Sequence, residues 1–195
     1  MNHNVILIVA STAGYVSLVS QSILFFVMFG LNQATHVGLF YHICIAALLV
    51  SHVVFFSGYF LIGFILQHRL QKIASIALLG TALLLNIVFF YGSDLTTYFT
   101  NNSDFISTYY HLLQLHAIAL VVFVFGIWGL RKQYYAVINP IIIISIANAV
   151  FSYSVFFSAF TWVLVPLFYY FSSKLFMGAR NNFYTLNQLQ AKSSK

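Results

Sequence analysis

The charged side chains of this chain, eight Lys or Arg and two Asp or Glu, all lie outside five long apolar stretches. The stretches are residues 5–31, 37–66, 73–91, 105–130 and 138–171. Each is close to or above the roughly 20 residues that a helix needs to cross the hydrocarbon core of a bilayer. A charge at the centre of the bilayer costs at least about 2.5 kcal/mol, so this sorting is typical of membrane-spanning helices. The sequence therefore predicts an all-α, polytopic transmembrane helix bundle of five spans.

The composition leaves little room for any other kind of domain. Charged residues make up 5% of the chain, whereas soluble domains carry about 25%. We expect one transmembrane domain over residues 1–177 and a polar C-terminal tail over residues 178–195. The first apolar stretch is longer than the roughly 7–15-residue core of a cleaved signal peptide, so we interpret it as a retained span.

The last apolar stretch, residues 138–171, is too long for one simple crossing. Its 34 residues would form a helix of about 51 Å at 1.5 Å per residue, compared with a hydrocarbon core of about 30 Å. Two spans and a turn do not fit within its limits. We therefore predict one long, tilted helix, kinked at Pro166 because proline removes a backbone hydrogen bond.

The basic residues predict the orientation, with one conflict. The second and fourth loops carry four of them, whereas the opposite loops carry Asp94 and Asp104. The positive-inside rule then places these basic loops and the N-terminus in the cytoplasm of a multi-pass plasma or inner membrane protein. Five spans would place the tail on the opposite side, although it is basic as well. We give the short loops more weight. The loop residues are Arg69, Lys72, Arg131 and Lys132, and the basic residues towards the C-terminus are Lys174, Arg180, Lys192 and Lys195.

Histidines are the candidates for chemistry inside the membrane. The spans contain no acidic residue, no glycine-rich phosphate loop and a single cysteine, so no catalytic or metal site is predicted. Two histidines lie in span two and two in span four, which raises b-type haem ligation between helices as an alternative. The sequence intervals are ten and five residues, so two stacked haems fit poorly, although single pairs remain possible. Otherwise each imidazole would hydrogen-bond a carbonyl or a polar neighbour. These alternative haem ligands are His42, His52, His111 and His116.

Other polar and aromatic residues within the spans have simpler interpretations. Thr81 and Asn148 are expected to hold helices together. Tyr169 lies near the end of the fifth apolar stretch, so we expect it in an interfacial aromatic belt.

Four stretches give the chain a resemblance to a known family. They are LVSQSILFF (18–26), LVS followed by LLG (49–51 and 78–80), YHLLQLH (110–116), and Phe157 and Trp162 followed by PLFY (166–169). In this order they resemble subunit III of haem–copper oxidases, in the short five-helix form of bacterial quinol oxidases and nitric-oxide-reductase-associated proteins. The family-like positions are Ser20, Gln21, His116, Phe157 and Trp162.

The chain also departs from the family pattern. Gln21 stands where the family has an acidic residue, and Val155, Phe156 and Ala159 stand at its Trp, His and Asp positions. The family's two histidines on helix four are three residues apart, whereas those of this chain are five apart. The chain is therefore similar to a divergent member.

The resemblance implies a non-catalytic accessory subunit of a respiratory haem–copper oxidase or nitric oxide reductase. Such a subunit packs on the catalytic subunit I, binds membrane lipid, and has no cofactor of its own and no nucleic-acid partner. Two alternatives stay open. One is a small b-type haem electron-transfer protein, with His42 paired to His111 or His52 paired to His116. The other is a membrane sensor or scaffold domain.

Overall fold

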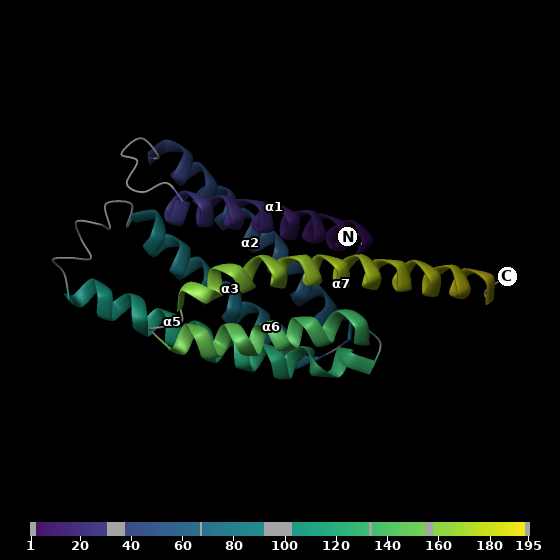
Figure 1. Cartoon of the computed structure of the whole chain (residues 1–195). Helices are drawn as coiled ribbons and strands as arrows, with labels where there is room; N and C mark the ends of the chain where they lie inside the picture. The colour runs from purple at the N-terminus through teal and green to yellow at the C-terminus, as the bar shows by residue number, and fades with distance from the viewer. Residues whose placement is uncertain are drawn as a thin grey trace.

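The computed structural model is a bundle of antiparallel helices (Figure 1), and it describes residues 3–30, 38–66, 68–91, 103–132, 134–154 and 158–193. The predicted family-like position Phe157 and the neighbouring Val155 and Phe156 lie outside the described residues. Within these ranges the chain forms helices only. They are α1 (His3–Gly30), α2 (Gly38–Ile65), α3 (Arg69–Tyr91), α5 (Ser103–Trp128), α6 (Tyr135–Tyr153) and α7 (Ser158–Ser193), with a 3₁₀ turn, η2 (Gly129–Lys132), between α5 and α6.

All six described α-helices are long and apolar enough to cross a membrane, so the prediction of a helical membrane bundle is confirmed. The described chain has six candidate spans where the sequence predicted five. The stretch 138–171 breaks at Ser154, which has an extended backbone conformation and ends α6. The second helix then runs beyond the apolar stretch, and its membrane-compatible part is Phe160–Asn182.

The two numbers differ because the sequence prediction ended every span at the first charged residue. Lys174 lies within α7 but is exposed, and its Nζ atom lies 5.5 Å from the ring centre of Tyr170. A long lysine side chain can cover apolar surface with its methylene groups while its ammonium group reaches towards water. The helix therefore tolerates this charge and continues without a break past residue 177, the predicted end of the transmembrane domain, to Ser193.

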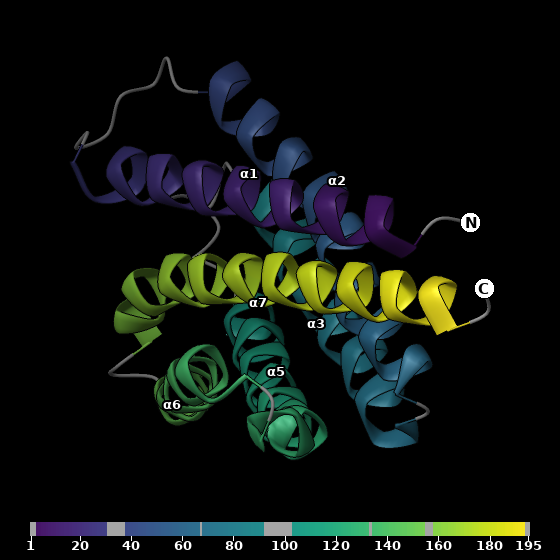
Figure 2. The ribbon, with the colours of Figure 1, turned by 90° about the vertical axis from the view of Figure 1, so that its right-hand side faces the viewer.

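The six helices form a closed ring. Each packs against its neighbours in chain order, and α7 returns to pack on α1. Figure 2 shows α7 running beside α1, with α5 and α6 on its other side. The six described α-helices alternate in direction, so both termini lie at the same end of the bundle (Figure 1). The loops after α2 and α5 lie at that end too, so the tail and the basic loops share one side and the conflict over orientation disappears.

Small and hydroxyl residues allow α1, α2 and α7 to approach one another closely. Ser11 and Ser173 each donate a side-chain hydrogen bond to the other's backbone carbonyl, at 3.1 and 3.0 Å. The Tyr59 hydroxyl donates to Ser172 Oγ at 2.5 Å. A Cβ atom added at Gly58 would lie 2.7 Å from the Ala10 Cβ. Close backbone contact and interhelical hydrogen bonds of this kind drive helix association where the hydrophobic effect cannot.

Candidate functional site: a polar cavity within the bundle

A cavity of about 100 Å³ lies inside the helix ring, and all six α-helices contribute to its wall. By liquid volume this is room for about three water molecules. The wall is partly apolar, as expected of a ligand pocket. Its polar members come from every helix: Gln21 from α1, His52 from α2, Asn86 from α3, Tyr109 and His116 from α5, Asn148 and Ser152 from α6, and Thr161 and Tyr169 from α7. We call this the central cavity.

His52 is held by hydrogen bonds at both ring nitrogens. Its Nδ1 atom lies 2.5 Å from the carbonyl oxygen of Leu48, one turn earlier on α2. Because a carbonyl only accepts, Nδ1 carries the proton, and Nε2 of the neutral ring accepts from the Tyr169 hydroxyl. The Tyr169 ring meets the imidazole edge-on, with centroids 5.5 Å apart. This pair fixes α2 against α7 and leaves the phenol oxygen able to accept a further hydrogen bond.

His116 is held at one nitrogen only. Its Nδ1 atom lies 2.8 Å from Thr81 Oγ1, and that hydroxyl also lies 3.1 Å from the carbonyls of Ala77 and Leu78. A helical threonine donates to such carbonyls, so its oxygen accepts the proton of His116 Nδ1. The other nitrogen, Nε2, then keeps its lone pair, and in the described part of the chain no side chain or backbone group donates to it.

Asn148 supplies the most informative atom of the wall. The residue is 3% exposed, and its side-chain oxygen Oδ1 has no hydrogen-bond partner among the described residues. Leaving a buried acceptor unpaired costs about 1–3 kcal/mol. Buried polar atoms in native proteins are nearly always paired, so an exception needs an explanation. Asn86, by contrast, bonds its own helix through Nδ2, which lies 2.7 Å from the Ala82 carbonyl.

The wall therefore offers several acceptors and no formal charge. The Nε2 atom of His116 and the phenol oxygen of Tyr169 can accept hydrogen bonds, and the unpaired amide oxygen of Asn148 is buried close to them. No Asp, Glu, Lys or Arg lines the central cavity. A cation would lose its hydration without a counter-charge, which is expensive within a membrane. The cavity suits a small, neutral molecule that donates hydrogen bonds.

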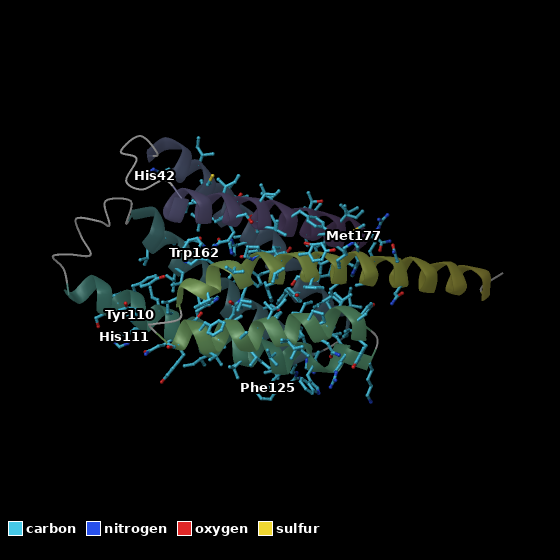
Figure 3. The ribbon with its side chains drawn as sticks, viewed as in Figure 1. His42, Tyr110, His111, Phe125, Trp162 and Met177 are labelled. Carbon is cyan, nitrogen blue, oxygen red and sulfur yellow. The ribbon has the colours of Figure 1, made fainter. Side chains whose placement is uncertain are left out.

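The structure brings together one of the two predicted histidine pairs. His52 and His116 line the same cavity. His42 lies near the start of α2 and His111 near the start of α5, on opposite sides of the bundle in Figure 3, so these two do not form a pair. As the bundle is built, both ring nitrogens of His52 are hydrogen-bonded, so neither is free to bind iron. Ligation of a haem by His52 and His116 would require both bonds of His52 to break and the helices to separate.

Three of the family-like positions also meet at this cavity, since Gln21, His116 and Trp162 all line it. Figure 3 shows Trp162 on the first turns of α7. Ser20, which precedes Gln21 in the chain, is buried as well. Within the described residues, no three His, Cys, Asp or Glu side chains lie close enough together to hold a metal ion.

Sequence reasoning missed several residues of the site, and three of them matter most here. Tyr169 was assigned to an interfacial belt, but it is buried because α7 extends well beyond the apolar stretch. Thr81 and Asn148 were interpreted only as contacts between helices. The serines near the middle of the fifth stretch, among them Ser154 and Ser158, favour a break in the helix there. With such a break, Tyr169 would lie inside a second helix instead of at the end of one long span.

Comparison of the chain with models of protein families, with curated proteins and with solved structures finds no match.

Proposed function

We propose that this protein binds a small, neutral hydrogen-bond donor in the central cavity and acts as a membrane receptor or carrier for it. The observation that carries the proposal is an uncharged cavity inside the bundle, whose wall takes polar side chains from all six helices, His52 and His116 among them. Polar groups buried within a membrane bundle are expensive, and they are retained where a ligand or ion uses them.

Primary amides match this description best. An amide ligand has two N–H donors for acceptors such as His116 Nε2 and the Tyr169 oxygen, and its small size suits about 100 Å³. The best small ligands gain at most about 1.5 kcal/mol per non-hydrogen atom. For acetamide that limit is about 6 kcal/mol, so its Kd is expected to be no lower than tens of micromolar.

The test compares acetamide with acetone, which has the same shape but a methyl group in place of the amide nitrogen. The purified protein in detergent would be titrated with each compound while its thermal unfolding is followed. We expect acetamide to raise the unfolding temperature in a saturable manner and acetone to have little effect. If the two compounds act alike, the proposal is wrong, since hydrogen-bond donation would then play no part.

Asn148→Leu and Ser145→Ala form a matched pair of variants. Both remove a buried polar atom that has no partner in the described chain, and both lie on α6. Only Asn148 lines the central cavity. We expect Asn148→Leu to abolish the response to acetamide and Ser145→Ala to retain it. A full response in Asn148→Leu would contradict the assignment of this site.

The accessory-subunit function stays a prediction based on the resemblance to subunit III alone. Purification from native membranes in mild detergent, followed by mass spectrometry, tests it. A stoichiometric haem–copper oxidase or nitric oxide reductase subunit is the expected partner. Isolation of the chain without such a partner would contradict this function, and a red preparation would instead support the b-haem alternative.

The side of the membrane is also a proposal. Both termini and the basic loops lie at one end of the bundle (Figure 1), and the positive-inside rule assigns that end to the cytoplasm. A membrane-impermeant thiol reagent tests the assignment in intact cells with the variants Lys132→Cys and Cys44→Ser combined. We expect labelling only after the membrane is permeabilised.

A further inference from the structure

Two chains of hydrogen bonds end at the wall of the central cavity, and each begins at a backbone carbonyl. In the first chain, His52 Nδ1 donates to the Leu48 carbonyl and the Tyr169 hydroxyl donates to His52 Nε2. In the second, the Thr81 hydroxyl donates to carbonyls of its own helix and accepts from His116 Nδ1. A carbonyl oxygen can only accept, so every hydrogen bond in both chains is donated away from the cavity.

This direction decides what each chain presents to a ligand. The Tyr169 proton is used in the bond to His52, so the phenol oxygen presents lone pairs to the cavity. The Nδ1 proton of His116 is used in the bond to Thr81, so Nε2 presents a lone pair as well. His116 is only partly buried and lines the cavity. At both positions the cavity therefore offers an acceptor and no donor.

Thr81 sets the direction of the second chain without lining the cavity. The residue lies on α3, is 7% exposed and is not among the residues of the cavity wall. Its Oγ1 atom lies 3.1 Å from the carbonyl oxygens of Ala77 and Leu78 and 2.8 Å from His116 Nδ1. Because the one hydroxyl proton is directed to these carbonyls, the oxygen is left to accept from the imidazole.

Removal of this hydroxyl would reverse the imidazole of His116. A proton on Nδ1 would then be buried without an acceptor, which is unfavourable. The other neutral form of the ring avoids this cost: the proton leaves Nδ1 and a proton binds at Nε2, so the charge of the ring does not change. Nε2–H would then donate into the cavity, where water or an acceptor group of a ligand can bind it.

We propose that Thr81 determines the specificity of the central cavity for hydrogen-bond donors, as a positioning residue that fixes the proton of His116 on Nδ1. The inference rests on the proposed function, since it gives the reason why donors are preferred there. Ketones, ethers and other molecules that only accept hydrogen bonds are disfavoured, because their lone pairs would face the lone pair of Nε2.

Nuclear magnetic resonance of the full chain in detergent, with ¹⁵N-labelled histidine, locates the proton directly, because protonated and unprotonated ring nitrogens differ widely in chemical shift. The chain has seven histidines, so the signals of His116 are identified by their loss in His116→Gln. We expect Nδ1 to be protonated in the original chain and Nε2 to be protonated in Thr81→Val. A proton on Nε2 in the original chain would overturn the proposal, and this result does not require any Thr81 variant to fold.

Two further variants separate the hydroxyl of Thr81 from its packing. Thr81→Ser keeps the hydroxyl and should keep both the original spectrum and the original selectivity. Thr12→Val makes the same change as Thr81→Val at an exposed threonine of α1, whose hydroxyl donates to the Ile8 carbonyl at 3.0 Å. It should also leave the His116 signals as they are. A merely structural role of Thr81 would lower the unfolding temperature of Thr81→Val without moving the proton of His116.

The selectivity itself is measured by following thermal unfolding during titration with acetamide and with acetone. In Thr81→Val, acetone gains a hydrogen bond from Nε2–H, and acetamide can turn its carbonyl oxygen to the same atom. We therefore expect the ratio of the two apparent affinities to fall roughly tenfold relative to the original chain.

The failure of this inference differs from the failure of the proposed function. If the original chain responds equally to acetamide and acetone, the proposed function is wrong, and the role of Thr81 in selectivity falls with it. If the original chain prefers acetamide and Thr81→Val keeps the same preference, the function stands and the inference about Thr81 is overturned.

Discussion

Two regions of the bundle differ in the hydrogen bonding of their buried polar atoms. They are the contact of α1 and α2 with α7, and the central cavity. At the contact, Ser11 pairs with Ser173 and Tyr59 with Ser172. At the cavity wall, Asn148 Oδ1 has no partner in the described chain. Both regions contain similar polar residues at similar burial. The comparison teaches that a polar residue in a membrane helix is a structural contact where its hydrogen bonds are complete and a candidate binding site where they are not.

The largest effect is expected from overpacking the tight contact. In Gly58→Leu the new Cβ would lie 2.7 Å from Ala10 Cβ and 3.0 Å from Phe176 Cζ, so the helices must separate. We expect the free energy of unfolding to fall by about 3 kcal/mol or more, measured by titration with a denaturing detergent. Gly80→Leu is the control, because nothing lies within 4 Å of a Cβ added there. Equal losses in the two variants would contradict the close packing at Gly58.

A smaller loss in the free energy of unfolding is expected when the hydrogen bond between His52 and Tyr169 is removed. This bond lies where the two regions meet. His52→Leu leaves the buried Tyr169 hydroxyl without its acceptor, which costs about 2 kcal/mol. Adding Tyr169→Phe removes the unpaired hydroxyl and should recover about 1 kcal/mol, a coupling that a double-mutant cycle measures. Additive losses would mean that the two side chains do not interact.

The smallest change in the free energy of unfolding is expected from a substitution at the cavity wall, and this change is a gain in stability. Asn148→Leu replaces a side chain whose buried amide oxygen is unpaired by an apolar group of similar size, so the free energy of unfolding without ligand should rise by about 1 kcal/mol. The same detergent titration measures it. A loss of stability would mean that Asn148 Oδ1 has a partner after all, and Asn148 would then belong with the paired residues of the contact between α1, α2 and α7.

The sequence located part of the site for a physical reason. Histidine is rare and expensive in a membrane span, so His52 and His116 could be selected as candidates from the sequence alone. The sequence could not predict whether Asn148 Oδ1 has a hydrogen-bond partner, because that depends on which atoms of other helices come within hydrogen-bond distance.

The sequence by itself determined that the chain is helical and spans a membrane. Charge is costly in hydrocarbon, so charged residues are kept out of the long apolar stretches however the helices pack. Only the tertiary structure decided how many membrane-length helices the chain forms and which polar groups remain unpaired. The break at Ser154 and the continuation of α7 past Lys174 depend on how the last two helices pack into the ring and on where their charged ends can reach water. The same packing brings His52, His116 and Asn148 from three helices to one cavity.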